Sequence, residues 1–418
     1  MKQSGIDWIG EIPDDWKINQ LSQIVSQVKN KNTGLKENNL LSLSYGKIKR
    51  KDINTNDGLL PASFDGYNII GDGDIVLRLT DLQNDHTSLR VGRATEQGII
   101  TSAYTTLHPV DYDNSKYLYY ILHSFDLKKG FYGMGSGVRQ GLNYDEVKTL
   151  KVPLPPKATQ QRIAEYLDKK VSEIDSIIEE SKKSIEEYKA WKQSVIFEAV
   201  TGKNLNCKKK DSGIEWIGEI PEGWEVRALK TLFRIFSGTT PKSDRAEFWD
   251  GDIKWITPAD FSTEDIFISN GKRNISNKGF KSYSLEMIPA GNLIFSKRAP
   301  IGKVCINTDE ICTNQGCLAC VKKIDLNIKF FYYFISTLTE YFELLGSGTT
   351  FKEISLSAFS DFKISYPPLS EQVSITKMLD SKCAQIDSLI TEKESLIADL
   401  TEYKKSLIFE VVTGKRSI

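Results

Sequence analysis

Apolar residues recur in alternating steps of four and three near the end of each half of the chain. The two runs start at Leu167 and Leu379, with many Glu and Lys residues at the other positions and neither Pro nor Gly inside. A heptad repeat of this length predicts two long helices, each with a coiled-coil seam. The predicted seam residues are Leu167, Val171, Ile174, Ile178, Ile185, Tyr188, Leu379, Cys383, Ile386, Ile390, Ile397 and Leu400.

Proline and glycine mark the ends of both predicted helices. Pro-Pro pairs at residues 155–156 and 367–368 precede them, and Gly202 and Gly414 follow them. We expect Thr159 and Ser370 to cap the first turns. Each helix then has about 45 residues and a length of roughly 65–70 Å.

A lone amphipathic helix of this length needs a partner for its apolar side. Either the two copies pair antiparallel within one chain, or parallel seams join two chains; the intervening domain returns the chain to its start and favours the first. Polar residues interrupt the seams at Ser181, Lys192, Lys393 and Lys404. They either fix the register or, for the lysines, extend their charged ends into water.

The chain contains two related halves. The segment at residues 4–16 returns at residues 212–224 with ten of thirteen residues identical. The segments from Pro155 and from Ile196 return 212 positions later, including the doubled V-T-G-K. The interiors between these edges, 138 and 142 residues long, share only scattered identities. Such a pattern indicates duplicated domains whose edges share one task and whose interiors have different tasks.

The interiors contain short apolar runs separated by Gly, Pro and Asn, which predict strand-rich domains. In the second interior these runs are residues 251–261, 291–306 and 317–321, and residues 328–337 are predicted to form a buried helix that matches residues 116–124. We therefore expect an α+β fold with a pseudo-two-fold internal repeat and an antiparallel coiled coil. The expected divisions are a first strand-rich domain at 1–155, a helix at 156–203, a linker with the second strand-rich domain at 204–368, and a helix at 369–418.

Composition narrows the class of protein. The 418 residues are 40% hydrophobic and 26% charged, which is typical of a globular chain with two or three domains. No apolar run approaches the roughly 18 residues of a membrane span, and the first residues lack a signal-peptide pattern, so we expect a cytoplasmic protein with reduced cysteines.

Charge is balanced, with 55 basic and 55 acidic residues, which excludes a polycation that coats nucleic acid. Residues 28–51 nevertheless carry seven basic residues and one acid, and residues 266–285 carry four basic residues and no acid. These stretches are either solvated loops or local nucleic-acid contacts.

Recognisable catalytic motifs are missing from the sequence. It contains no GxxxxGK[ST] phosphate loop, no strand followed by a glycine-rich cofactor loop, and only three widely spaced histidines, His86, His108 and His123. Asp244 with Asp252 faintly resembles a metal-nuclease pair, which leaves an enzyme as one rival hypothesis, and a pure interaction scaffold is the other. We expect no catalytic residue and no cofactor bound by this chain.

Four cysteines lie within sixteen residues of the second interior, and Cys317 and Cys320 have zinc-ligand spacing. The first interior has no cysteine, and two residues three apart in a strand point to opposite faces. Buried thiols are therefore favoured over a zinc site, and we expect no metal.

Loops of both interiors combine cations with Asn, Gln, Ser and Thr. Arg and Lys can bind phosphates or guanine edges, and Asn and Gln can bind adenine edges. The predicted phosphate contacts are Lys47, Lys49, Arg50, Lys242, Arg245, Lys272, Arg273 and Lys352. The predicted base-reading residues are Arg78, Gln83, Asn84, Arg90, Lys297, Arg298, Asn314 and Gln315, and Arg93 and Lys303 complete the predicted DNA-binding set.

Taken together, the motifs resemble the specificity subunit of Type I restriction-modification systems. They are the doubled W-I-G-E-I-P-x-x-W, the P-P-x-x-x-Q segments with their L-D and I-D pairs, the doubled V-T-G-K, and W-I-T-P-A-D, S-K-R-A-P-I-G-K and T-N-Q-G of the second interior. The first interior departs from W-I-T-P-A-D and S-K-R, and Arg78-Leu79-Thr80 and residues 90–93 occupy the corresponding region.

The resemblance implies a non-catalytic DNA-binding subunit that reads a bipartite, asymmetric site in double-stranded DNA, with the helices as a ruler over the spacer. It also implies two methyltransferase subunits and two translocase-endonuclease subunits as partners, with S-adenosylmethionine, ATP and magnesium bound by those partners.

Overall fold

The computed structural model describes residues 1–54, 61, 63–85, 87–134, 141–262, 265–347 and 352–418. The chain forms two compact units. Unit 1 consists of residues 1–182 and 394–418, and unit 2 consists of residues 183–393. The units therefore divide the two long helices between them instead of following the ends of the predicted domains. Among the described residues, no helix is both long and apolar enough to cross a membrane.

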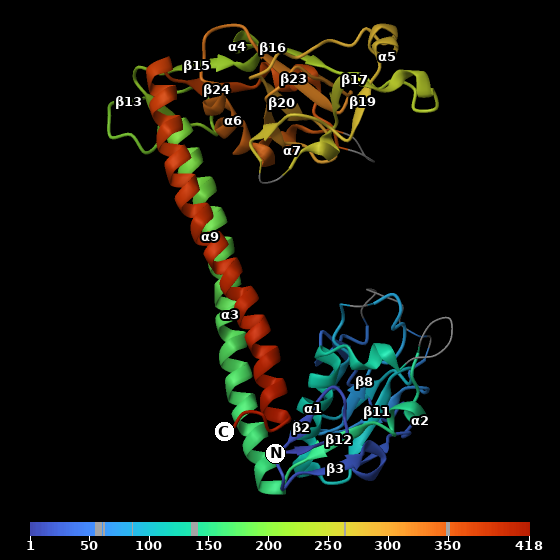
Figure 1. The fold of residues 1–418 in the computed structure, drawn as a ribbon. Coiled ribbons are helices and arrows are strands. Elements are labelled where there is room, and N and C mark those ends of the chain that lie inside the picture. The colour runs from blue at the N-terminus through green and yellow to red at the C-terminus, as the bar shows by residue number, and fades with distance from the viewer. Residues whose placement is uncertain (55–60, 62, 86, 135–140, 263–264, 348–351) are drawn as a thin grey trace. The chain divides into compact units, whose positions relative to one another are not determined.

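Unit 1 is a strand-rich domain with one main helix on the sheet (Figure 1). Its strands are β1 (Lys2–Gln3), β2 (Glu11–Ile12), β3 (Lys17–Gln20), β4 (Val25–Gln27), β5 (Leu41–Ser44), β6 (Lys47–Arg50), β7 (Asn68–Ile70), β8 (Ile75–Leu77), β9 (Val91–Arg93), β10 (Gly98–Ile100), β11 (Thr105–Pro109) and β12 (Lys151–Leu154). Its helices are α1 (Ser115–Leu127), α2 (Tyr144–Val147) and the first part of α3 (Lys157–Thr201), together with the last part of α9.

Unit 2 repeats this organisation with more helices. Its strands are β13 (Lys209–Asp211), β14 (Glu219–Pro221), β15 (Glu225–Ala228), β16 (Phe233–Ser237), β17 (Trp249–Ile256), β18 (Phe267–Ile268), β19 (Arg273–Ile275), β20 (Leu293–Ser296), β21 (Val304–Asn307), β22 (Cys312–Thr313), β23 (Cys317–Lys322) and β24 (Lys363–Tyr366). Its helices are α4 (Leu229–Leu232), α5 (Asn277–Ser282), α6 (Ile328–Ser336), α7 (Thr339–Leu345), α8 (Leu356–Asp361) and parts of α3 and α9 (Leu369–Val412). The helix predicted at residues 328–337 is confirmed, and its aromatic residues lie in the core.

The main sheets of the two units have the same strand order despite their unlike sequences. The order is β4-β11-β8-β9 in unit 1 and β16-β23-β20-β21-β18 in unit 2, so the first four strands correspond one by one. The neighbouring strands within these four are antiparallel in both units. The predicted α+β class with an internal repeat is thereby confirmed. The connection between β8 and β9 corresponds to the connection between β20 and β21.

Each sheet domain is fixed to its long helix by the aspartate of the repeated Leu-Asp pair. Asp168 on α3 accepts hydrogen bonds from Lys116 Nζ (2.6 Å) and Tyr120 Oη (2.8 Å) of α1. Asp380 on α9 accepts equivalent bonds from α6. The same carboxylate contact therefore anchors both domains.

Within each unit, α3 and α9 pack side by side and antiparallel (Figure 1). Leu167, Ile174 and Ile178 share a core with Leu407 and Val411 in unit 1. In unit 2 the shared core includes Ile196, Leu379 and Cys383. All twelve predicted seam residues are buried or half-buried. This confirms the antiparallel pairing within one chain.

Two of the polar seam residues form ion pairs across the helices. Lys404 Nζ lies 2.5 Å from Asp175 Oδ1 in unit 1, and Lys192 Nζ lies 2.7 Å from Asp387 Oδ2 in unit 2. The two pairs are equivalent positions of the repeat. Burial raises the pKa of Asp175, but the hydrogen bond and charge of Lys404 outweigh it, so this pKa lies below its ordinary value. These lysines therefore pair with the aspartates of the repeated Ile-Asp motif.

The predicted capping by Thr159 and Ser370 is wrong. The helices begin at Lys157 and Leu369, so both residues lie inside the first turn. The side chain of Gln160 instead donates from Nε2 to the carbonyl oxygen of Pro155 (2.8 Å), and Gln372 makes the same bond in the second copy. The predicted ends at the glycines are confirmed, because both have φ of +74°.

The repeated N-terminal segment packs on the end of the helix from the other half. In unit 1, a Cβ on Gly414 would lie 2.4 Å from Pro13 Cδ and 3.1 Å from Trp16 Cη2. In unit 2, Gly202 meets Pro221 and Trp224 in the same way. The doubled W-I-G-E-I-P-x-x-W and V-T-G-K motifs are thus two sides of one contact, made once in each unit.

The cysteines do not form a metal site. All six are free thiols, and Cys317 and Cys320 lie on opposite sides of β23, in separate apolar cores. Burial raises the pKa of Cys312 to about 12, which keeps this thiol protonated at neutral pH. In the described part of the chain, no group of three or more His, Cys, Asp or Glu residues could hold a metal ion, and Asp244 with Asp252 therefore gains no partner there.

Candidate nucleic-acid interface

The base-reading residues predicted in the two interiors lie mainly on corresponding connections. Arg78, Gln83 and Asn84 lie between β8 and β9, and Lys297 and Arg298 lie between β20 and β21. Because these hairpins have the same place in the strand order, the two unlike sequences present polar side chains at one shared position of the frame.

The β8–β9 connection has buried and exposed sides. Leu79 and Leu82 are buried, whereas Gln83 and Asn84 are exposed. Asn84 Nδ2 donates to Asp81 Oδ1 (2.8 Å). His86 lies outside the described residues. The exposed amides have the chemistry to read an adenine edge.

Arg78 is half-buried and pairs with Asp85, at 3.5 Å between Nη2 and Oδ2. Hydrogen bonds from Ser88 hold the pKa of Asp85 well below its ordinary value, so this carboxylate is charged. Arg78 is therefore available to DNA only if the phosphate or base competes with Asp85.

The prediction that Arg90 reads a base is wrong. Its side chain is fully buried, and its guanidinium donates to four main-chain carbonyl oxygens and to Tyr132 Oη. Arg93 is also turned into the protein, where it donates to Ser115 Oγ (2.8 Å) and pairs with Asp72 (3.2 Å). Both arginines stabilise unit 1 instead of facing solvent.

Glu353 forms ion pairs with two of the predicted DNA-binding cations of unit 2. Lys297 Nζ lies 2.7 Å from Glu353 Oε1, and Arg298 Nη1 lies 3.6 Å from Glu353 Oε2. The side chain of Lys297 is only 12% exposed, whereas that of Arg298 is 35% exposed. Lys303 donates to the carbonyl oxygen of Phe261 (3.2 Å). Arg298 is thus more accessible than Lys297.

Asn314 and Gln315 form a turn before β23. Asn314 Oδ1 accepts from the N–H of Gly316 (2.9 Å), which fixes the turn, and the side-chain oxygen of Gln315 accepts from Thr240. Gln315 remains exposed and Asn314 is half-buried, so Gln315 is the better placed of the two for an outside contact.

Several predicted phosphate contacts have partners inside their own unit. Lys47 pairs with Asp175, Arg50 with Glu96 and Arg245 with Glu247, and Arg273 stacks on Trp249 with 4.0 Å between guanidinium and ring centre. Among the predicted phosphate contacts, the exposed lysines without an ion pair to any described residue are Lys49, Lys242, Lys272 and Lys352. These four are the simplest candidates for phosphate contacts.

Two residues with a place in this surface were missed in the sequence. Glu353 neutralises Lys297 and Arg298, and no motif links residues so far apart in the chain. Tyr45, at the turn between β5 and β6, is 78% exposed and has a positive φ of 48°. The Tyr-Gly pair between two alternating stretches was the available signal for such a hairpin.

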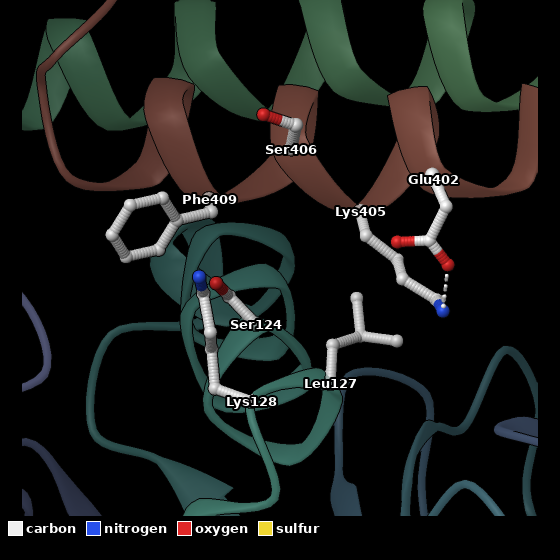
Figure 2. A pocket seen from close by; sticks show the side chains of 7 residues that line it. All are labelled: Ser124, Leu127, Lys128, Glu402, Lys405, Ser406 and Phe409. Carbon is white, nitrogen blue, oxygen red and sulfur yellow. Dashed lines mark hydrogen bonds and ion pairs between the residues drawn. The ribbon is translucent and has the colours of Figure 1, made fainter. Parts of the chain in front are cut away.

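Unit 1 also has a surface hollow of about 360 Å³ between the end of α1 and α9 (Figure 2). Lys405 pairs with Glu402 on one side, and Lys128 lies over the ring of Phe409 at 4.4 Å on the other. Both cations are engaged with the protein, and the hollow lacks the convergent free polar groups of a ligand site.

Two titratable groups are buried near this hollow. Burial lowers the pKa of His123 to about 4, and burial raises the pKa of Asp126 to about 6. His123 stacks on Tyr119 and Asp126 accepts from the main-chain N–H of Arg90, so both belong to the core.

The sequence matches the family described as Type I restriction modification DNA specificity domain over residues 13–187 and again over residues 221–398. The chain belongs to this family. The two matches coincide with the two halves of the repeat and cover most of the chain, so the family's specificity domain is present twice.

Relatives in the specificity-domain family match over part or all of the chain. The MjaIX specificity subunit of a Type I restriction enzyme of Methanocaldococcus jannaschii is 38% identical over 181 residues, which is 43% of this chain and 41% of that protein. The putative MjaX specificity subunit of the same organism is 27% identical over 97% of this chain and 95% of that protein.

Solved structures show the same fold at low identity. A chain from a study of complex assembly and conformational transition of the Type I restriction-modification system has a TM-score of 0.76 at 16% identity, covering 97% of this chain and all of that chain. The HsdS subunit of Thermoanaerobacter tengcongensis has a TM-score of 0.57 at 15% identity, with both chains fully covered.

Proposed function

We propose that this member of the specificity-domain family reads a bipartite, asymmetric site in double-stranded DNA, one half with each unit, and docks methyltransferase subunits on its helices. In this proposal the chain is not itself a catalyst. The two long helices set the spacing between the half-sites.

The proposal rests on one observation: the two units share the arrangement of their strands but have different loops at corresponding places. Both units have the same strand order and the same aspartate anchor to a long helix. The connections at β8–β9 and β20–β21 differ in length, sequence and side-chain chemistry. An equal frame serves a common task, and unlike loops on it suit the reading of two different base sequences.

Repeated apolar residues on the helix surfaces support docking of two identical partners. Ile177 and Tyr403 in unit 1 and Trp191 and Leu389 in unit 2 are between 37% and 48% exposed. Ile177 corresponds to Leu389 in the repeat, and Trp191 corresponds to Tyr403. Ile177 and Trp191 are fourteen positions apart on α3, and Leu389 and Tyr403 are fourteen positions apart on α9. Large apolar side chains kept exposed at equivalent places are typical of protein-binding surfaces.

The proposed partners supply the chemistry. Two methyltransferase subunits would bind S-adenosylmethionine and modify adenine, and two translocase-endonuclease subunits would bind ATP and magnesium.

The test uses the full chain together with a Type I methyltransferase subunit from the same organism. Incubation with a pool of random-sequence duplexes, followed by sequencing of the bound fraction, should give one motif with two unlike halves and an unread spacer. Binding without sequence preference would contradict the proposal and support a scaffold. Cleavage by this chain alone in the presence of magnesium would support the nuclease rival.

A further inference from the structure

The connection between β8 and β9 is held from inside by a buried arginine. The Nη1 atom of Arg90 donates to the carbonyl oxygens of Arg78 (3.1 Å) and Thr80 (2.8 Å), and Nη2 donates to those of Asp81 (3.3 Å) and Asp85. Nε donates to the hydroxyl of a tyrosine of unit 1, Tyr132, at 3.0 Å. All five N–H donors of the guanidinium are therefore used.

These bonds indicate that Arg90 fixes the conformation of residues 78–85. A buried charge is costly unless it is paired and hydrogen-bonded. In the part of the chain that the structure describes, no carboxylate oxygen lies within ion-pair distance of this guanidinium; Asp126 accepts the main-chain N–H of Arg90 instead. The guanidinium is thus solvated by four carbonyls of residues 78–85, and any other path of this segment would leave the charge without them.

Residues 78–85, which the hydrogen bonds of Arg90 hold in place, carry two exposed amide side chains. Leu79 and Leu82 are buried in the core, and Gln83 and Asn84, which follow them, are exposed. Asp81 takes a positive φ of 58°, a conformation that few residues adopt without support, and its carbonyl is one of the four that Arg90 binds. The strained turn, the buried leucines and the clamp together fix where the two amides stand.

Unit 2 also has a cation at the corresponding position, but its hydrogen bond leads elsewhere. Arg90 directly precedes β9, and Lys303 directly precedes β21. Lys303 also turns inward and donates to one main-chain carbonyl, that of Phe261. Phe261 lies outside the β20–β21 connection, so Lys303 does not hold its own loop, and the cation that binds four carbonyls of its own connection belongs to unit 1.

We propose that Arg90 is a positioning residue for the half-site read by unit 1, where it holds residues 78–85 so that Gln83 and Asn84 meet base edges of the DNA, adenine edges above all. This inference rests on the proposed function. It assigns the reading segment of unit 1 to residues 78–85 and gives Arg90 a role without any contact to DNA.

The test compares two variants of the full chain, each assembled with the same methyltransferase subunit as in the test of the proposed function. Arg90→Lys keeps the charge but leaves three donors that cannot span four carbonyls. The double variant Gln83→Ala with Asn84→Ala removes the presented amides and leaves the clamp intact. Each complex selects from the same pool of random-sequence duplexes, and the bound fraction is sequenced.

Both variants should lose about tenfold or more of the discrimination at the same base positions, all within one half of the motif. The other half should be unchanged, and it serves as the internal control. A solely structural role of Arg90 would lower binding to every duplex and leave the motif as it is.

A motif that Arg90→Lys leaves unchanged, or weakens equally in both halves, would overturn the inference. If this variant fails to fold, which thermal unfolding reveals, Tyr132→Phe replaces it, because that change removes only the hydroxyl bound to Arg90 Nε and must affect the same base positions. If the wild-type complex selects no two-part motif, the proposed function fails; if it does and only the Arg90 result is negative, the inference alone fails.

Discussion

Half of the cations of the predicted DNA surface bind an acidic residue of their own unit. Glu353 holds both Lys297 and Arg298, Asp85 holds Arg78, and Glu96 holds Arg50. Exposed ion pairs of this kind contribute little to stability. These ion pairs matter for DNA binding instead, because a DNA phosphate or base must displace a carboxylate to reach each paired cation. Binding should therefore depend on the fit of the DNA more than on bulk charge.

Arg298→Ala should weaken specific duplex binding by about 1–3 kcal/mol, because Arg298 is the accessible cation of the β20–β21 connection. The measurement is a titration of the complex with the selected duplex at fixed salt. Glu353→Gln is the matched control. It removes the competing carboxylate and should strengthen binding to non-specific duplex and steepen its salt dependence. Unchanged affinities in both variants would remove this connection from the interface.

The buried imidazole of His123 makes unit 1 sensitive to acid. Its folded pKa of about 4 lies below the ordinary value of 6.5, so the unfolded state binds the proton more readily. Stability from this group is present above pH 6.5 and is lost as the pH falls towards 4. His123→Gln should therefore gain roughly 3 kcal/mol relative to wild type between pH 7 and pH 4. Urea denaturation at both pH values measures this, and a constant difference would contradict the assignment.

At the residue scale, the sequence predicts which side chains can bind DNA but not which of them are free. Arg90 and Arg78 look alike in the sequence, yet one is fully buried and the other half-exposed. The difference depends on carbonyl groups of residues 78–85, whose directions follow from the folded path of the chain. Glu353 was missed because it reaches Lys297 only through the fold.

Among the elements, the long helices could be predicted most completely. Their heptad period, their glycine ends and their antiparallel pairing follow from local pattern and chain connectivity. The start of each helix could not be placed as well, because Thr159 and Ser370 are good capping residues, whereas each helix begins directly after its Pro-Pro pair, at Lys157 and Leu369. Lys404 and Lys192 in the seam form ion pairs with Asp175 and Asp387 on the opposite helix. These pairs could not be predicted, because they depend on the register between the two helices.

The exposed apolar positions on these helices predict how many partners bind. Trp191→Ser with Leu389→Ser should remove one of two methyltransferase subunits, because each exposed side chain at a protein interface contributes on the order of 1 kcal/mol or more. Native mass spectrometry of the assembled complex counts the subunits.

The equivalent variant in unit 1, Ile177→Ser with Tyr403→Ser, should have the same effect, and both together should leave no stable complex. Leu344→Ser is the control, since Leu344 is exposed on a different helix. A complex with two partner subunits in all variants would place the docking surface elsewhere.

For the whole molecule, the repeat is the feature that the sequence reveals best. The edges of the repeat coincide with structure: β3 begins at Lys17 and pairs with β12, which ends at Leu154, and β15 and β24 enclose the second interior in the same way. The equal strand order inside these boundaries could not be predicted, because the interiors share too few residues. Equal pairing of unlike strands became visible only in the structure.

The helices connect the units, so their length should set the spacer of the DNA site. The ion pairs Asp175–Lys404 and Lys192–Asp387 are the same number of residues apart on both helices, so an equal deletion between them keeps both. Removing residues 179–185 and 394–400 shortens each helix by about 10 Å, the length of about three base pairs. The selected motif should have a changed spacer, or assembly should fail; an unchanged spacer would refute the ruler.

The central claim is that two unlike interiors on one repeated frame each read their own half-site. It is tested most directly by replacing residues 225–366 with a second copy of residues 17–154 and determining the motif that the complex then selects. The account predicts a site whose two halves are the same sequence, namely the half that unit 1 reads in the wild-type chain. A motif that still contains the original second half would contradict it.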